Sequence, residues 1–194
     1  MWWLKPGVFL LCSLPFLLLA TAVYQQNLGA NPIETLNHST GDWTLRFLLI
    51  TLSMTPLRQL SGWTGWIRFR RMLGLFAFFY AVLHFLSWIW LDQQFLWPSI
   101  VEDVLERPYI TVGFTAFVLL IPLALTSNGY SMRKLKRRWQ TLHKLVYLIA
   151  VLGVLHYLWL VKADNLEPLV YLGTLVFLLV FRLPLIRSRI RGLG

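Results

Sequence analysis

Four histidines are the residues of this chain best suited to chemistry: His38, His84, His143 and His156. All except His38 lie within long apolar runs. Imidazole is costly to place in hydrocarbon, so a histidine inside a membrane segment marks a candidate functional site. Neutral imidazole is also a common ligand of transition metals and of haem iron. Ligation of a metal or haem inside a membrane is therefore the first chemistry to consider.

The depths of two histidines favour a facing pair. Counted from the basic starts of their apolar runs, His84 lies about 18 Å deep and His156 about 22 Å deep, at 1.5 Å per helical residue. Two neutral imidazoles on facing helices can hold a haem iron from both sides. The alternative is that each histidine only hydrogen-bonds a neighbouring helix. Small residues would leave room for the flat macrocycle: Gly74, Ala77, Ala81 and Gly153.

His143 is a candidate for a second, inner site that takes a haem, FMN or a quinone. On one continuous helix it would lie about 20 Å from His156, with the two rings about 140° apart around the axis unless Gly153 permits a bend. Arg70 and Arg71 occupy the matching depth in the third apolar run. Neither is a haem ligand, but arginine pairs well with phosphate or carboxylate. The alternative for His143 is an interfacial histidine among lipid headgroups.

Three further residues are candidates for contacts with a cofactor or a partner. His38 lies in an outer segment, where it could cover a haem edge or contact a partner protein; simple solvation is the alternative. Arg46 and Arg182 lie inside or at the edge of apolar runs, and haem propionates would be suitable partners for either. The alternative for both arginines is that they extend to the membrane interface.

Composition predicts an all-α integral membrane protein. The 194 residues are 57% hydrophobic and 13% charged, with a mean hydropathy of +0.62, a balance foreign to soluble domains. The single cysteine, Cys12, excludes an internal disulfide. We predict one domain, 1–194, without a nucleic-acid partner, because basic loops of a membrane protein explain the net charge of +10. The six predicted spans are 7–24, 43–57, 72–91, 109–126, 141–161 and 168–186.

Charge alternation orients this six-helix bundle. The loops on one side carry all eight acidic residues, with Arg107 and Lys162 as their only basic residues, and the loops on the other side are basic. The positive-inside rule then places both termini in the cytoplasm. Ala-Thr-Ala at 20–22 resembles a signal-peptide cleavage site, but cleavage would spoil the alternation, so the first run is predicted to stay as a span. The chain shows no phosphate-binding glycine loop, no nucleotide-binding βαβ pattern and no recognisable internal repeat.

Six segments spread over the chain form a specific combination: HSTGDW (38–43), TPLRQLSG (55–62), RRMLGLFAFFYAVLH (70–84), ERPYITVG (106–113), PLALTS (122–127) and WQTLHKLVYL (139–148). Together they resemble the MsrQ family, also called YedZ, which belongs to the ferric-reductase-like transmembrane group. The resemblance covers nearly the whole chain and implies a six-helix bundle in the bacterial inner membrane that binds b-type haem. The family's haem histidines fall on His84, His143 and His156, and FMN has also been attributed to the family.

The resemblance implies an electron-transfer subunit rather than a catalyst on its own. Electrons would come from the quinone pool or a cytoplasmic flavin reductase. They would go to MsrP, a periplasmic molybdopterin enzyme that reduces methionine sulfoxide in oxidised proteins. The chain lacks a fourth intramembrane histidine, which departs from the two-haem arrangement and favours FMN or quinone at the inner site. The acidic outer segments are candidates for docking, namely those with Asp92, Glu102, Asp103 and Glu106.

Two alternatives remain open at this stage. A stand-alone ferric or quinone reductase of the same fold would share the haem and differ only in its acceptor. A transporter or scaffold without cofactor would show no visible absorbance. An intramembrane zinc hydrolase is disfavoured, because the predicted spans contain no acidic ligand or base.

Overall fold

The computed structural model describes residues 4–161 and 166–182, and within these ranges the secondary structure is helical, without strands. The predicted all-α class is therefore confirmed. The elements are α1 (Leu4–Tyr24), α2 (Pro32–Ser61), α3 (Trp66–Leu86), the π-helix η1 (Ser87–Asp92), α4 (Trp97–Glu106), α5 (Pro108–Leu125), α6 (Gly129–Leu135), α7 (Arg137–Leu142), α8 (Leu145–Leu160) and α9 (Leu166–Val180).

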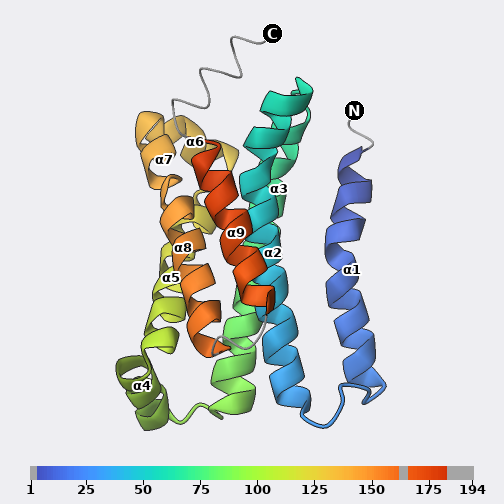
Figure 1. Ribbon diagram of the computed structural model, residues 1–194, viewed down its shortest axis with the longest axis vertical. Helices are drawn as coiled ribbons and strands as arrows, with labels where there is room; N and C mark the ends of the chain where they lie inside the picture. Colours follow the sequence, from blue (N-terminus) through green and yellow to red (C-terminus); the bar gives the residue numbers. More distant parts are fainter. Residues whose placement is uncertain (1–3, 162–165, 183–194) are drawn as a thin grey trace.

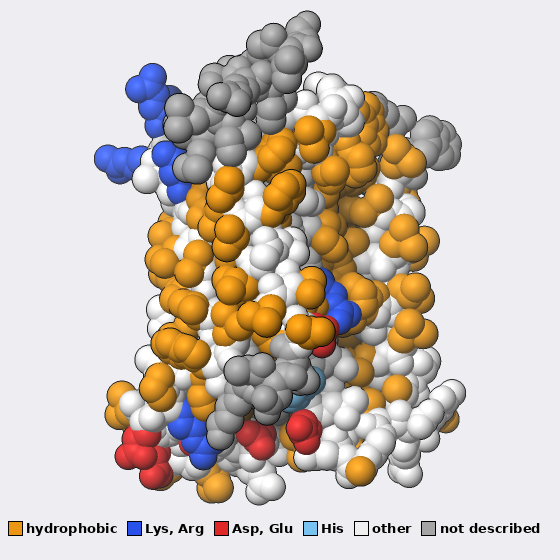
Figure 2. Space-filling view, viewed as in Figure 1, with side chains coloured by type: hydrophobic (Ala, Val, Ile, Leu, Met, Phe, Trp, Pro, Cys, Tyr) orange, Lys and Arg blue, Asp and Glu red, His pale blue; other side chains and the backbone are white. Residues whose placement is uncertain are grey.

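Six long helices, α1, α2, α3, α5, α8 and α9, run along the long axis of the molecule in alternating directions (Figure 1). The short helix α4 lies at one end, and α6 and α7 lie at the other; we call these the α4 end and the α6 end. Helix α1 begins and α9 finishes at the α6 end (Figure 1). Acidic side chains gather at the α4 end, and lysine and arginine side chains project at the α6 end (Figure 2).

Helix α2 is longer than the predicted span 43–57. It begins at Pro32 because the Asn31 side chain accepts a hydrogen bond from the Glu34 N–H (3.3 Å) and proline suits the first helical turn. It ends where Gly62 adopts a left-handed conformation (φ +69°) and its N–H bonds the Arg58 carbonyl at 3.0 Å. The stretch around His38, predicted to be an outer loop, is therefore helical.

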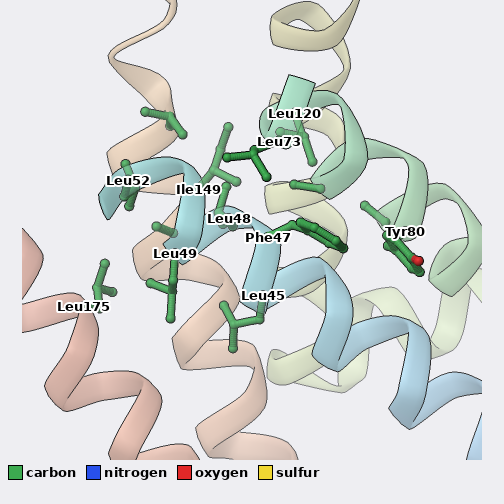
Figure 3. Packing of buried hydrophobic residues seen from close by; sticks show 14 of the residues in the cluster. Leu45, Phe47, Leu48, Leu49, Leu52, Leu73, Tyr80, Leu120, Ile149 and Leu175 are labelled. Atoms are coloured by element: carbon green, nitrogen blue, oxygen red, sulfur yellow. The ribbon is translucent and has the colours of Figure 1, made fainter. Parts of the chain in front are cut away.

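The core lies where α2 packs on α3 and where α5 packs on α8, the two most extensive helix pairs. Apolar side chains of α2 fill its centre, with residues of α3, α5, α8 and α9 around them (Figure 3). Tyr80 of α3 is fully buried, and its hydroxyl accepts from the Phe16 N–H (2.9 Å) and donates to the Cys12 carbonyl (3.0 Å). Those two groups ordinarily bond each other within a helix. Tyr80 thus fastens α1 to the bundle next to Pro15.

Four segments among the described residues are long and apolar enough to cross a membrane: Leu4–Tyr24, Trp66–Asp92, Pro108–Leu125 and Arg137–Leu160. Helix α9 is apolar but shorter, and the predicted sixth span continues to 186, outside the described residues. Helix α2 lies alongside them in the bundle (Figure 1) but carries charged residues near both ends. Many large apolar side chains face outward from the bundle, which suits a lipid-facing surface.

The fifth predicted span, 141–161, is interrupted at His143. Helix α7 ends at Leu142 and α8 begins at Leu145, so His143 and Lys144 form the junction. The expectation of one continuous helix from Leu142 to His156 is therefore wrong. Helix α8 runs unbroken through Gly153, and the interruption lies at His143 and Lys144 instead.

Candidate cofactor site

A cavity opens between α2, α3, α5 and α8 toward the α4 end. Its volume is about 510 Å³, within the range of about 300–1,000 Å³ usual for ligand pockets. The deep part of its wall is apolar and consists of Leu45, Leu48, Ala81, Ala116, Leu120, Ile149 and Gly153. The mouth is polar and includes Asn31, Glu34, His38, Asp42, Asp92 and Arg107. In Figure 2 a histidine side chain is visible near this end beside acidic side chains.

His84 and His156 face each other across this cavity, as expected from their similar predicted depths. Their ring centroids are 6.1 Å apart and the ring planes differ by 70°. Nδ1 of His84 lies 3.0 Å from the Asn37 carbonyl, and Nδ1 of His156 lies 2.7 Å from the Tyr109 carbonyl. A carbonyl oxygen only accepts, so each Nδ1 carries the proton and donates. Each Nε2 is then a free lone-pair donor, and neither has a hydrogen-bond partner among the described residues.

Each histidine ring lies against a glycine of the neighbouring helix. Gly41 is one turn after Asn37 on α2, and Gly113 is one turn after Tyr109 on α5. A Cβ at Gly41 would lie 3.1 Å from Cε1 of His84, and one at Gly113 would lie 2.7 Å from Nδ1 of His156. Only glycine lets these backbones approach so closely. Sequence analysis missed both glycines, although they lie in the segments HSTGDW and ERPYITVG.

The two halves of the site are an internal repeat. Both histidine–carbonyl hydrogen bonds connect residues 47 positions apart. The sequence around His84, AVLHFL in 81–86, matches GVLHYL in 153–158. Helices α2 and α5 run in one direction and α3 and α8 in the other (Figure 1), so the pairs α2–α3 and α5–α8 are equivalent. The absence of a recognisable repeat was therefore a wrong expectation; outside these motifs the two halves share few residues.

The two arginines predicted to contact propionates do not line the cavity. Arg46 donates from Nε to the Tyr171 hydroxyl (2.8 Å), and its Nη2 lies 3.5 Å from Asp42 and 3.4 Å from Glu167. Arg182 donates to the Leu52 carbonyl (2.5 Å) and to the Tyr147 hydroxyl. Of the four small residues predicted to leave room for the macrocycle, two line the cavity, Ala81 and Gly153. The other two do not: Ala77 is buried in the core and Gly74 faces Thr51.

The structure brings one sequence candidate, His38, and one further charged residue, Arg107, to the mouth. His38 is exposed there, with Nε2 3.9 Å from Glu34. Arg107, which sequence analysis noted only as an exception among acidic loops, also lines the mouth. Its Nε lies 3.0 Å from an Asp103 oxygen. The Tyr109 hydroxyl and then the Asp103 carboxylate raise the pKa of the Arg107 guanidinium above its ordinary value, so Arg107 is a permanent cation.

His143 does not reach this cavity. Its Nε2 lies 3.1 Å from the Thr126 hydroxyl, and its ring stacks on Trp139 with centroids 3.9 Å apart. Arg70 is half-buried and lies close enough to interact electrostatically with His143, while Arg71 is exposed. The internal repeat makes Arg71 the equivalent of His143. No second pair of facing imidazoles therefore forms in the described part of the chain.

The residues around the cavity fit a haem held by His84 and His156. A bond between a metal ion and an imidazole nitrogen is about 2 Å long, and the ring centre lies about 1 Å beyond the nitrogen, so two such ligands on one iron have centroids about 6 Å apart. The observed 6.1 Å agrees with this. The free Nε2 atoms, the apolar depth and the polar mouth match a macrocycle that is apolar on one edge and carries carboxylates on the other.

Comparison with known proteins shows the family of the chain. Residues 40–154 match the family model for the ferric reductase like transmembrane component. The protein-methionine-sulfoxide reductase heme-binding subunit MsrQ of Xanthomonas campestris pv. campestris (strain 8004) is 57% identical over 155 residues, 80% of this chain and 71% of that protein. The MsrQ of Herminiimonas arsenicoxydans is 54% identical over 180 residues (91% and 82%), and that of Azospira oryzae is 50% identical over 191 residues (97% and 82%). This chain belongs to the MsrQ family of ferric-reductase-like membrane proteins.

Proposed function

We propose that this chain is the haem-binding electron-transfer subunit of a methionine sulfoxide reductase system and that it holds one haem b. The observation that carries the proposal is the facing pair His84 and His156, with both Nε2 atoms free. The printed names of the relatives state a heme-binding subunit of protein-methionine-sulfoxide reductase. When bound, the haem supplies reversible one-electron chemistry.

The chain's own residues orient and protect this site. The Asn37 and Tyr109 carbonyls fix the tautomer of each imidazole and hold its ring, a role that second-layer hydrogen bonds commonly have at metal sites. The Ser87 hydroxyl donates to the Asn37 side chain at 2.6 Å and steadies that residue. The apolar walls exclude water from the deep part of the cavity. The polar mouth leaves one edge open to the α4 end.

The α4 end faces the periplasm in this proposal, and the chain crosses the bacterial inner membrane six times with both termini in the cytoplasm. Support comes from the basic α6 end and the positive-inside rule. A periplasmic molybdopterin reductase of the MsrP type would dock at the acidic α4 end. The exposed carboxylates Glu34, Asp92, Glu102 and Glu106 suit docking. Asp103 does not, because it is only 6% exposed and already paired.

Electrons enter at the α6 end in this proposal, from a quinone or a cytoplasmic flavin reductase. His143, Arg70 and Arg71 lie there, and Arg70 also interacts electrostatically with Arg182. The Nε of Arg182 is buried without a hydrogen-bond partner among the described residues. This cationic surrounding suits an anionic group such as a flavin phosphate or a reduced quinone. His143 would contact that group rather than ligate a second haem.

The test is the visible spectrum of the purified protein, oxidised and dithionite-reduced, from cells supplied with a haem precursor. We expect a b-type spectrum that is lost in His84→Ala and in His156→Ala. His38→Ala is the matched control, because His38 lies at the mouth and should leave the spectrum intact. A colourless wild-type protein would contradict the proposal and favour a transporter or scaffold. A spectrum that survives both substitutions would exclude the proposed ligand pair.

A further inference from the structure

We propose that Arg107 is the cation that pairs with a propionate carboxylate of the tetrapyrrole held between His84 and His156. The inference rests on the proposed function and adds the residue that fixes the macrocycle's orientation and tunes its electron affinity. Among the described residues that line the cavity, Arg107 is the one lysine or arginine. Its side chain is 55% exposed, at the mouth rather than in the depth.

The chain segment that carries Arg107 also orients His156, one of the two proposed haem ligands. Arg107 lies at the junction of α4 and α5, where an extended backbone (φ −104°, ψ 100°) turns the chain into α5. Two residues later, the Tyr109 carbonyl accepts the hydrogen bond from His156 Nδ1. The same short segment therefore fixes both the imidazole on one face of the macrocycle and the guanidinium at its edge.

A polar network holds Arg107 in this position. Asp103, one turn earlier on α4, accepts from Arg107 Nε (3.0 Å) and from Gln93 Nε2 (2.7 Å). The Ser99 hydroxyl in turn donates to the side-chain amide oxygen Oε1 of Gln93 at 2.8 Å. Asp103 engages Nε of the guanidinium, and Nη1 makes a long hydrogen bond of 3.5 Å to the Tyr109 hydroxyl. Nη2 donates to no described residue, so the guanidinium keeps outer N–H groups for a further acceptor. Arginine offers such nitrogens in a fork that matches a carboxylate.

The charges at the mouth explain why a cation is required there. Glu34, Asp42 and Asp92 line the mouth, and of these Asp42 already has Arg46 at 3.5 Å. A macrocycle inserted with its apolar edge inward brings two more carboxylates to the same place. Like charges at close range raise the cost of binding. Arg107 offsets this repulsion on the α5 side. A fixed positive charge near the iron also favours the reduced state, so removing it should lower the midpoint potential.

The test uses the purified full chain, reconstituted from its haem-free form with haem b or with haem b dimethyl ester, whose propionates carry no charge. Arg107→Gln removes the proposed pairing. Arg58→Gln, an exposed arginine near the α6 end of α2, is the control for loss of one positive charge. The measurements are the rate of haem transfer to excess apomyoglobin and the midpoint potential.

We expect Arg107→Gln to lose haem b about tenfold faster than wild type, as for loss of one charge-assisted hydrogen bond, and to have a lower midpoint potential. Haem b dimethyl ester should dissociate from the wild-type protein and from Arg107→Gln at the same rate. Binding of the ester by Arg107→Gln shows that this variant is folded. Two results would overturn the inference while leaving the proposed function intact. In the first, haem b dissociates from Arg107→Gln and from the wild-type protein at the same rate. In the second, the substitution speeds the dissociation of haem b and of its dimethyl ester by the same factor. A wild-type chain that takes up neither ligand would overturn both.

Discussion

Replacing Gly113 by alanine should separate the stability of the fold from the integrity of the site. The new Cβ would lie 2.7 Å from His156 Nδ1, 2.9 Å from Cε1 and 3.0 Å from Cγ. Ordinary contact between such atoms requires about 3.5 Å, so the ring must retreat by about 0.8 Å. The neighbour is the face of a ring that is itself fixed by a hydrogen bond, so it cannot simply rotate away.

The magnitude follows from what that retreat breaks. A shift of about 0.8 Å would stretch the 2.7 Å bond from Nδ1 to the Tyr109 carbonyl to the limit of a hydrogen bond. Loss of such a bond costs about 1 kcal/mol, and disturbing the groups that orient a metal ligand typically weakens metal binding by about 10- to 100-fold. Alanine in place of a helix-interior glycine otherwise stabilises a helix by up to about 1 kcal/mol. Haem retention should therefore fall by at least about tenfold while the fold keeps its stability.

The assay measures haem content, the rate of haem transfer to apomyoglobin and the thermal unfolding of the haem-free protein. Gly173→Ala is the matched control, because Gly173 also lies inside a helix but has nothing within 4 Å of its would-be Cβ. Equal rates of haem loss for Gly113→Ala and Gly173→Ala would refute the reasoning. So would a haem-free Gly113→Ala protein that no longer folds.

Three further substitutions test other parts of the molecule. Gly41→Ala should weaken haem retention less than Gly113→Ala, by a few-fold, because its Cβ would lie 3.1 Å from the nearest atom of the His84 ring and needs a smaller shift; haem transfer rates of the two variants decide this. Tyr80→Phe should lower thermal stability by roughly 1–3 kcal/mol through its two lost hydrogen bonds to α1, with an unchanged visible spectrum; an unaltered unfolding temperature would contradict it. His143→Ala should keep the full b-type spectrum but slow reduction by quinol, and loss of absorbance would show that His143 ligates haem.

The sequence alone indicated that His84 and His156 lie at similar depths, because depth depends on a single helical constant. The rise per residue fixes the depth of each histidine once the run boundaries are known. That the two rings also face one another depends on how α3 and α8 are placed in the bundle, which the structure supplies. The all-α class follows directly from composition and needs no knowledge of which helix packs against which.

Most of the features that sequence analysis did not predict depend on contacts between helices that are distant in the sequence. Gly41 and Gly113 matter only because α2 lies against one imidazole and α5 against the other, which no local pattern reveals. Arg46 was a reasonable candidate inside an apolar run, but its partners Tyr171 and Glu167 come from α9, far away in sequence. The break at His143 was also invisible, since hydropathy reports how apolar a stretch is and not whether its helix is continuous.

The internal repeat has a consequence for assembly. Each helical hairpin, α2–α3 or α5–α8, supplies one imidazole, one carbonyl that holds it and one glycine that admits it, so neither hairpin can grip a macrocycle alone. A haem held at the proposed site would contact both hairpins at once. Part of its binding free energy would then stabilise the packing of one hairpin against the other, as for metals whose sites exist only in the folded state. In that case haem supply and assembly of the bundle are linked.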